Sequence, residues 1–372
     1  MKNRIGFWQE EIGLQEEALE MRTEIVRVGQ GREAFTPQEE EALLRAGNII
    51  KQGGLVAFPT ETVYGLGGDA MNPESARKIY AAKGRPSDNP LIVHICRWAD
   101  IGLVAERVPE AARRLGEAFW PGPLTMILPK AARVPKETTG GLDTVAVRLP
   151  SHPAARRLIA LGGGFIAAPS ANVSGRPSPT SAAHVEADLQ GRIEMIVDGG
   201  PVGIGLESTI LDLTVEPPQI LRPGYVTEGM LQRVLGSVEA GRPGTEAQGA
   251  PRAPGMKYRH YAPAGELLVV EGPPREVVAY INRRTALDRE AGEKTGVMGT
   301  QELLEQYRAD VVKCVGRHGD EDGIARRLFS VLREFDSEEV TKIYSESFPA
   351  QGLGQAIMNR LLKAAGHRVV KL

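Results

Sequence analysis

A short stretch of this chain combines hydroxyl, cationic and imidazole side chains around two apolar runs. Thr60 and Thr62 directly follow the first run, LVAFP, and the cations Lys83 and Arg85 follow a segment of helix-forming composition. His94 lies within the second run, LIVHI. Loops held by a rigid α/β scaffold commonly carry such groups. Hydroxyls, two cations and an imidazole together suit a small polar ligand that lies beside a phosphate.

Lys83 and Arg85 flank Gly84, a residue type that predicts the end of a helix. The helix dipole favours a cation at a helix C-terminus by about 0.3–1 kcal/mol, so a structural role explains Lys83 as well as a functional one. Arg85 lies beyond the glycine, where the dipole acts on it less, and its planar guanidinium matches phosphate oxygens. We therefore expect Arg85 to bind an anion.

Arg148 lies within an alternating apolar strand, TVAVRLP. Val145 and Val147 face one side of this strand, and Arg148 faces the other. An arginine in that position needs a buried or half-buried anion as its partner. Two kinds of partner meet this need, a structural carboxylate of the chain or the carboxylate of a ligand.

Polar residues also lie at the ends of other apolar runs. Ser170, Asn172 and Thr180 follow one run, Ser208 precedes another, and Arg222 lies in the loop LRPG. Alone, each segment is typical of an ordinary turn, although small donors and acceptors also suit phosphate or purine edges. Together they predict a cleft with several cations and few carboxylates. Such a cleft suits catalysis by positioning an anionic substrate, without a covalent nucleophile.

Composition excludes several classes of protein. The 372 residues suffice for two domains, and a net charge of -2 argues against a surface that coats nucleic acid. The two cysteines, Cys96 and Cys314, fit buried thiols in a reducing cytosol and lack zinc-site spacing. The sequence contains no P-loop motif for binding phosphate. No apolar run is nearly as long as a membrane helix, which needs about 20 residues, and the first residues do not resemble a signal peptide. We expect a cytoplasmic protein with no membrane contact.

Apolar strands and helices alternate along the chain. Strands are expected at 55–59, 91–95, 124–128, 144–149, 165–168, 194–198 and 207–213, and helices near 73–83, 109–119, 153–161 and 180–189. Short connections and proline-rich turns predict an α/β fold with a twisted mixed sheet covered by helices. Alternation resumes near residue 266 with helices near 274–290, 301–307, 322–335 and 353–365, which predicts a smaller Rossmann-like α/β domain of five strands.

Four segments follow from these patterns: an N-terminal extension (1–25) with a second start at Met21, a catalytic domain (26–225), a linker (226–263) and a C-terminal α/β domain (264–372). The linker is rich in Gly, Pro, Ala and Glu but ends in the basic and aromatic motif PGMKYRHYAP. A linker that only connects two domains does not need such a cluster. We therefore expect the linker to act as a lid that excludes water from the site. The alternative is that the cluster is the first turn of the C-terminal domain.

Seven motifs, in order, carry a resemblance to a known family: PTETVYGLG, the K-x-R of AAKGRPSDNPLIVHI, WPGPLT, TVAVRLP, PSAN, ESTI and LRPG. They closely resemble the threonylcarbamoyl-AMP synthase (YrdC-like) family over about residues 40–225. The linker motif and the C-terminal domain resemble the longer, two-domain branch of that family. Only the N-terminal extension lacks a counterpart.

The resemblance implies a nucleotidyltransferase that joins L-threonine, bicarbonate or carbon dioxide, and ATP into threonylcarbamoyl-adenylate and releases pyrophosphate. The product serves the threonylcarbamoyl modification of the tRNA adenosine next to the anticodon, so a downstream tRNA threonylcarbamoyltransferase complex is the implied partner. Mg²⁺ is expected to arrive with ATP and not in a metal site of the protein. Weak RNA binding is left open.

Carried over position by position, the resemblance implies that Arg148 binds the carboxylate of the substrate L-threonine. The other residues that it assigns to binding this substrate are Thr62, His94 and Ser208. It assigns the nucleotide to Lys83, Arg85, Asn89, Ser170, Asn172, Thr180, Arg222 and Tyr261. Lys83 and Arg85 are the implied catalytic cations, because an N-carboxylate of threonine must approach the α-phosphate of ATP and the two anions repel.

Two other classes of protein share some of these features. A non-catalytic RNA-binding protein would have a similar concave basic surface, but near-neutral charge and only 5% aromatic residues argue against it. Hydrogenase-maturation carbamoyl transferases share the first domain but resemble longer chains with cysteine-rich zinc segments, which two lone cysteines do not match. Threonine-dependent release of pyrophosphate from ATP would distinguish all three classes.

Overall fold

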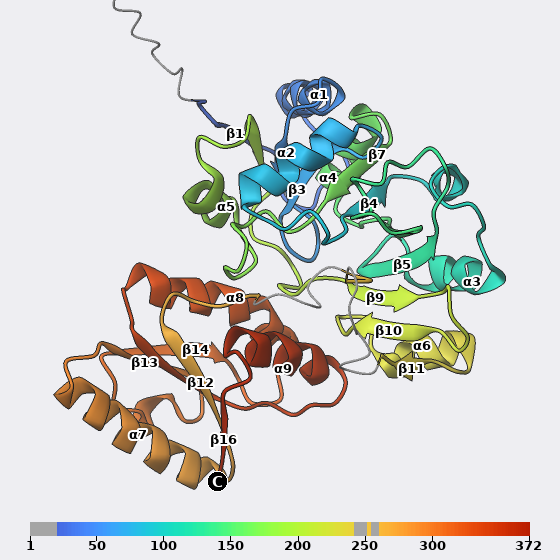
Figure 1. Ribbon diagram of the computed structural model, residues 1–372. Coiled ribbons are helices and arrows are strands. Elements are labelled where there is room, and N and C mark those ends of the chain that lie inside the picture. Colours follow the sequence, from blue (N-terminus) through green and yellow to red (C-terminus); the bar gives the residue numbers. More distant parts are fainter. Residues whose placement is uncertain (1–20, 242–250, 254–259) are drawn as a thin grey trace, which may run out of the picture.

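The computed structural model describes residues 21–241, 251–253 and 260–372, which form two α/β units (Figure 1). The predicted extension lies mostly outside the described residues. Its last part does not stand apart from the fold, because β1 (Glu24–Arg27) pairs in parallel with β8 (Met195–Asp198) at the edge of the first sheet. None of the described helices is both long enough and apolar enough to span a bilayer.

The first unit contains a mixed sheet of 11 strands. The other strands are β2 (Val56–Phe58), β3 (Gly65–Asp69), β4 (Ile92–Ile95), β5 (Leu124–Pro129), β6 (Thr144–Arg148), β7 (Phe165–Ala168), β9 (Thr209–Asp212), β10 (Gln219–Arg222) and β11 (Glu239–Ala240). Their order is β1-β8-β2-β3-β7-β4-β6-β5-β9-β10-β11, which confirms the expected mixed sheet. Parallel pairing of β4 with β6 places His94 directly opposite Arg148.

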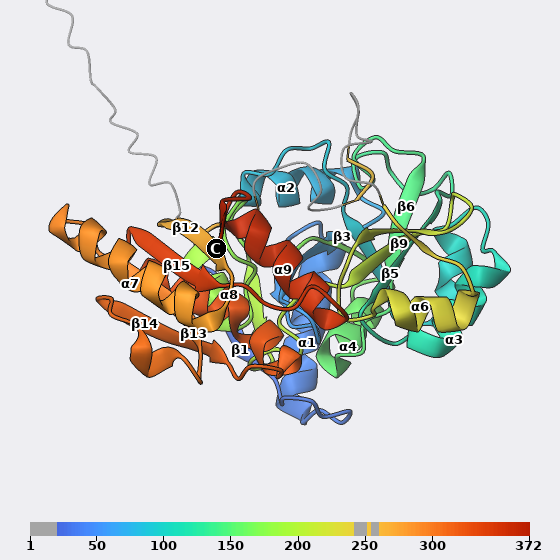
Figure 2. The ribbon, with the colours of Figure 1, turned by 90° about the horizontal axis from the view of Figure 1, so that it is seen from below.

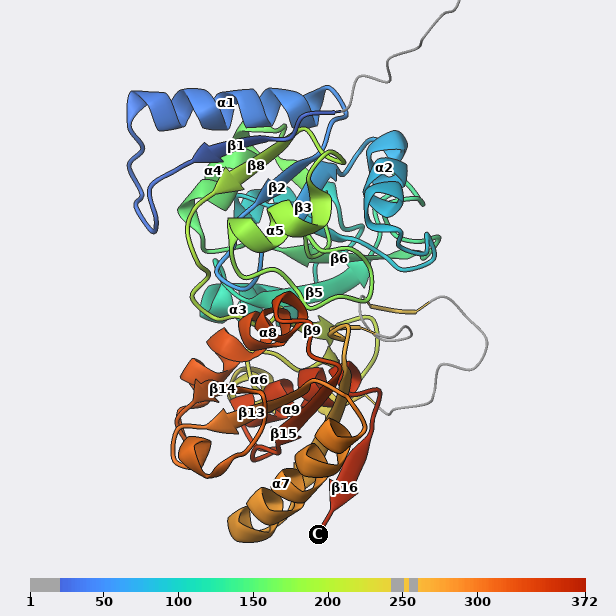
Figure 3. The same cartoon turned by 90° about the vertical axis from the view of Figure 1, so that its left-hand side faces the viewer.

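Helices cover both faces of this sheet, because alternate strand residues point to opposite sides. Val56 and Phe58 of β2 pack with helices α1 (Pro37–Lys51) and α4 (Pro153–Leu161). Leu55 and Ala57 face the other core, with α2 (Pro73–Lys83), α3 (Glu110–Phe119), α5 (Ala182–Leu189) and α6 (Glu228–Leu235). Figure 3 shows α1 lying along β1 at the top of the molecule.

The second unit contains a sheet of five parallel strands in the order β14-β13-β15-β12-β16. These strands are β12 (Glu266–Glu271), β13 (Thr295–Thr300), β14 (Val311–Gly316), β15 (Lys342–Glu346) and β16 (Val369–Lys371). Helix α7 (Pro274–Glu290) covers one face, and α8 (Glu321–Ser337) and α9 (Leu353–Ala364) cover the other. The core under α8 and α9 includes Val63 and Leu206 of the first unit, so these helices lie between the two units (Figures 1 and 2). The expected Rossmann-like α/β unit is confirmed.

The structure differs from the sequence-based expectations at several places, and strands β1, β10 and β16 are among the elements that were not predicted. Helix α6 and strand β11 lie within the predicted linker, and Leu231 of α6 is buried in the first core, so residues 228–240 belong to the first unit. The helix expected near 301–307 is a single 3₁₀ turn, Leu304–Gln306. Strand β3 was not predicted, because its sequence GLGGD has the composition of a turn. A Cβ at Gly67 would lie 2.7 Å from Ile166, which explains the glycine there.

Candidate active site

A buried cavity opens among the ends of strands β4, β6, β9 and β10 and the loops beside them. Its polar lining residues are Thr60, Thr62, Tyr64, Arg85, His94, Arg148, Ser170, Asn172, Glu207, Ser208, Arg222, His260 and Tyr261. The cavity thus collects every predicted site residue except Lys83, Asn89 and Thr180. Glu207 is the one carboxylate among its described lining residues, so positive charge predominates.

The turn after β2 is fixed by its own hydroxyls. The Thr60 hydroxyl donates to the carbonyl oxygen of Val63 at 2.6 Å and accepts from the backbone N–H of Thr62 at 3.1 Å. The hydroxyls of Thr60 and Thr62 are 2.8 Å apart, and both residues are buried. Turns closed by a threonine hydroxyl hold one conformation, so the Thr62 side chain has a defined place in the cavity wall.

Arg148 has a structural partner. Its Nη2 donates to Oε1 of Glu61 at 2.6 Å, and its Nε donates to the carbonyl oxygen of Gly122 at 3.4 Å. Of the two partners that the sequence left open, the carboxylate of the chain is therefore present. Nη1 makes no hydrogen bond to any residue that the structure describes, and Arg148 lines the cavity, so the guanidinium can still donate to a ligand carboxylate.

His94 lies beside Arg148 as a neutral ring. Burial, followed by the adjacent charge of Arg148, lowers the pKa of His94 to about 3. Nδ1 of His94 lies 3.1 Å from the carbonyl oxygen of Ile92 and donates to it, so Nε2 of the neutral ring can accept a hydrogen bond from a ligand hydroxyl without adding charge. The pair thus offers one cation and one neutral polar group within the same part of the cavity.

Two further arginines approach the cavity, Arg222 from the end of strand β10 and Arg85 from the loop after α2. Arg222 donates from Nε to the carbonyl oxygen of Ser208 at 3.0 Å and from Nη2 to the Ser208 hydroxyl at 3.2 Å. Arg85 donates from Nη2 to the carbonyl oxygen of Pro90 at 3.1 Å, while its buried Nε has no hydrogen-bond partner. Burial lowers the pKa of Arg85 to about 10, so it stays charged at neutral pH. A buried donor without a partner fits an anion that the cavity would hold.

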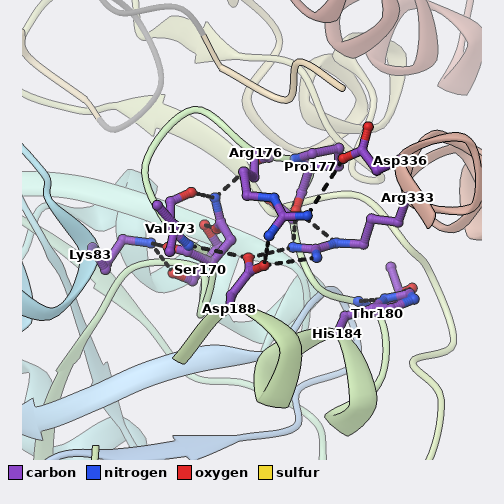
Figure 4. Close-up of polar contacts among 12 residues, drawn as sticks. Lys83, Ser170, Val173, Arg176, Pro177, Thr180, His184, Asp188, Arg333 and Asp336 are labelled. Atoms are coloured by element: carbon purple, nitrogen blue, oxygen red, sulfur yellow. Dashed lines mark hydrogen bonds and ion pairs between the residues drawn. The ribbon is translucent and has the colours of Figure 1, made fainter. Parts of the chain in front are cut away.

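Lys83 does not reach the cavity. Its ammonium group donates to the main-chain carbonyl oxygens of Ser170 (2.5 Å) and Asn172 (Figure 4). Burial, followed by the charge of Arg85, holds the pKa of Lys83 well below its usual range. The side chain therefore shapes the loop that carries Ser170 and Asn172, and this placement gives no direct contact to a bound phosphate.

Two predicted nucleotide residues also lie outside the cavity. The carbonyl oxygen of Asn89 accepts from the hydroxyl of Tyr80 at 3.2 Å, so its main chain helps to hold the loop after α2. The backbone nitrogen and the hydroxyl oxygen of Thr180 each lie 3.2 Å from Nδ1 of His184. Thr180 lines a separate groove. Asn89 lies in the loop between α2 and β4, and Thr180 lies in the loop before α5, and the sequence could not indicate which way each loop turns.

The C-terminal end of the linker closes one side of the cavity. His260 and Tyr261 line it, whereas Tyr258 and Arg259 of the same motif lie outside the described residues. The Tyr261 ring packs on Phe329 of α8 with ring centroids 5.1 Å apart, and its φ of 66° is left-handed. A non-glycine residue in that region is held there by its surroundings.

Sequence reasoning missed two residues that support the site. Glu61 binds Arg148, and Arg360 of α9 binds Glu207 at 2.9 Å. One signal for Arg360 was present, because it lies three residues after the buried Ile357 on the apolar face of a helix. A charged residue at such a position requires a buried partner, although the sequence does not indicate which one.

Two protein families match the chain. One, described as Telomere recombination, matches residues 48–224, and the other, described as the threonylcarbamoyl-AMP synthase C-terminal domain, matches residues 226–366. The chain is 48% identical over 336 residues to the threonylcarbamoyl-AMP synthase of Pyrococcus abyssi, covering 90% of this chain and 97% of that protein. It is 47% identical over 330 residues to that of Bacillus subtilis, covering 88% and 94%. The crystal structure of P. abyssi Sua5 complexed with L-threonine matches with a TM-score of 0.88 at 47% identity, over 94% of this chain and 100% of that chain.

Proposed function

We propose that the buried cavity binds L-threonine beside ATP and that the protein joins the two through a carbamate. The premise is that the chain belongs to the threonylcarbamoyl-AMP synthase family. The observation that carries this proposal is the convergence of three arginines, Arg85, Arg148 and Arg222, on a cavity with one lining carboxylate among the described residues. Such a charge balance suits a carboxylate and a polyphosphate bound together.

Threonine would occupy the part of the cavity between β4, β6 and β9. Arg148 would bind the carboxylate, and Thr62, His94 and Ser208 would surround the amine and the hydroxyl. Support comes from the pairing of His94 with Arg148 and from the 2.8 Å contact of Ser208 with Thr125, which fixes the serine hydroxyl. The P. abyssi relative, whose structure is described as a complex with L-threonine, supports the same class of ligand.

The nucleotide would lie along the loops that carry Arg85, Ser170, Asn172 and Arg222. Arg85 and Arg222 would bind phosphate oxygens, and Arg85 would act as the catalytic cation in direct contact with the reacting phosphate. Lys83 would act indirectly, since its hydrogen bonds hold the loop of Ser170 and Asn172. Asn89 and Thr180 would contact the nucleotide only after their loops move.

The reaction would proceed in two steps. The threonine amine attacks carbon dioxide, an N–C bond forms, and one proton leaves, which gives an N-carboxylate. One oxygen of this carboxylate attacks the α-phosphorus of ATP, and the bond from the α-phosphorus to its bridging oxygen breaks with the electron pair leaving on pyrophosphate. Arg85 and Arg222 would reduce the repulsion between the two anions and align them for this attack.

Mg²⁺ enters this proposal as part of the Mg·ATP substrate. No group of three or more His, Cys, Asp or Glu side chains in the described parts of the chain is arranged to hold a metal ion. Glu207, the carboxylate in the cavity wall, is already bound by Ser178 and Arg360. We assign the ion to the phosphates of ATP.

We also propose the setting of the reaction. Threonylcarbamoyl-adenylate would pass to a tRNA threonylcarbamoyltransferase complex that modifies the adenosine beside the anticodon, in the cytoplasm. We extend the catalytic domain of residues 26–225 to Ala240, because α6 and β11 pack on it. His260 and Tyr261, at the described end of the linker, would act as a lid over the cavity, and residues 264–372 would form the second domain.

The experiment that tests the proposed function is pyrophosphate release from ATP with bicarbonate and each of three amino acids. Threonine should support turnover, and serine, which lacks only a methyl group, should support less. Valine should fail, because it leaves buried hydroxyl and imidazole partners without a hydrogen bond at a cost of about 1–3 kcal/mol each. Equal turnover with valine and threonine would contradict the proposal.

A further inference from the structure

Arg360 is a fully buried arginine at the boundary between the two units. It extends from α9 of the second unit toward the first and has no exposed surface. A buried guanidinium is costly unless its donors are satisfied, so its hydrogen bonds show what fixes it in place. Every partner in the first unit lies next to the cavity.

The contacts of Arg360 join two separate segments of the cavity wall. Its Nε donates to Oε2 of Glu207 at 2.9 Å, and its Nη2 donates to the main-chain oxygen of Glu207 at 3.4 Å. Its Nη1 donates to the main-chain oxygen of Pro223 at 2.6 Å. Glu207 directly precedes Ser208, and Pro223 directly follows Arg222. One side chain thus holds the backbone beside Ser208, a proposed threonine-binding residue, and beside Arg222, a proposed nucleotide-binding residue.

The same guanidinium contacts the lid. Its carbon lies 5.8 Å from the centroid of the Tyr261 ring, within the range of a cation–π interaction. Glu207, which balances the charge of Arg360, also accepts a hydrogen bond from Ser178. Arg360 is therefore in contact with the threonine side, the nucleotide side and the lid of the cavity at once.

We propose that Arg360 is a positioning residue through which the C-terminal domain sets the spacing of Ser208 and Arg222 and seats Tyr261. This inference rests on the proposed function, because it takes Ser208 and Arg222 as substrate contacts. It assigns the C-terminal domain an indirect part in substrate binding, through the positions of Ser208, Arg222 and Tyr261. An error of about 1 Å in the position of a binding group can reduce a rate by about 10²-fold. A residue that fixes the positions of Ser208 and Arg222 therefore affects how well the site holds its substrates for reaction.

A second buried arginine provides the matched control. Arg333 of α8 also crosses between the units, and it donates to the main-chain oxygen of Pro177 at 2.6 Å and to Asp188 at 2.8 Å (Figure 4). Arg333 is 5% exposed. It therefore resembles Arg360 in residue type, burial and interface, but it holds neither Glu207 nor Pro223.

The test compares Arg360→Lys with Arg333→Lys in the full-length protein. Lysine keeps the positive charge beside the buried carboxylate, which favours folding, but one ammonium cannot reproduce the planar fork that reaches both segments. Thermal unfolding reports the integrity of each variant. Calorimetric titration with L-threonine and the KM for ATP in the pyrophosphate assay report the site.

We expect Arg360→Lys to weaken threonine binding and to raise the KM for ATP by about tenfold or more, whereas Arg333→Lys changes threonine binding by no more than about twofold. Wild-type affinity in Arg360→Lys, or equal losses in the two variants at equal stability, would overturn the positioning role. If Arg360→Lys fails to fold, Arg360→Met combined with Glu207→Gln removes both charges, and it must show the same loss of threonine affinity. Wild-type protein without threonine-dependent pyrophosphate release would overturn the proposed function instead.

Discussion

Replacing Arg148 by methionine should separate its two roles, in stability and in threonine binding. Arg148 is 4% exposed and its ion pair with Glu61 spans 2.6 Å. Arg148→Met leaves the half-buried carboxylate of Glu61 without its cation, and breaking a buried pair by removing one partner costs about 3–5 kcal/mol of unfolding free energy. It also removes a charge-assisted hydrogen bond to the ligand, worth about 1.5–3 kcal/mol, or about 10- to 150-fold in threonine affinity.

Glu61→Gln supplies the control. The amide oxygen of glutamine can still accept from Arg148, so the guanidinium should stay in place while the negative charge is lost. We expect this variant to lose less unfolding free energy than Arg148→Met and to retain threonine affinity. Urea unfolding gives the first quantity, and calorimetric titration with threonine gives the second. Wild-type threonine affinity in a folded Arg148→Met protein would refute the assignment and leave Arg148 with a structural role alone.

Three further predictions follow from the site. Arg85→Ala should reduce pyrophosphate release by at least about 10²-fold with threonine binding retained, because it removes a cation from the phosphate side; near-normal turnover would contradict this. Burial and the charge of Arg148 lower the pKa of His94 to about 3 in the folded protein, whereas the ring of the unfolded chain has a pKa near 6.5. Below about pH 6.5 the unfolded chain therefore binds one more proton, so acidification to pH 5 should lower the unfolding free energy by up to about 1.4 kcal/mol per pH unit. His94→Gln should make that pH slope shallower in urea unfolding, and an unchanged slope would exclude His94 as its source. Tyr261→Ala should reduce adenylate synthesis more than threonine binding, with Tyr261→Phe close to wild type in both; an unimpaired Tyr261→Ala would exclude the lid.

Much of the fold could be predicted because the pattern of apolar residues determines which faces of the strands are buried. The run LIVHI formed a central strand, and the expected helix end at Gly84 is present with a φ of 60°. Strand β3 escaped prediction because Gly65 and Gly67 are required by close packing against Phe58, a constraint that only the folded neighbours reveal. The composition of the predicted linker likewise concealed α6, whose Leu231 is buried against the first core.

The candidate site shows a similar division. Residue type and position at strand ends located most of the cavity, because neighbouring strands bring their ends to one place. The direction of a side chain at a helix end or within a loop was not predictable, and Lys83 at the end of α2 donates to two main-chain oxygens instead of reaching the cavity. Contacts between the units were equally inaccessible, since Arg360 and Glu207 are separated by 153 residues in the sequence.

The central claim is that one cavity joins threonine to the α-phosphate of ATP through a carbamate, and a double-label experiment tests it most directly. The wild-type protein would be given threonine, bicarbonate labelled at carbon and ATP labelled at the α-phosphate, and the products would be separated before hydrolysis. The account predicts one product that carries both labels in equal amounts and forms only with threonine, with unlabelled pyrophosphate released in the same quantity. Both labels in separate products, or α-label in AMP or ADP alone, would contradict it.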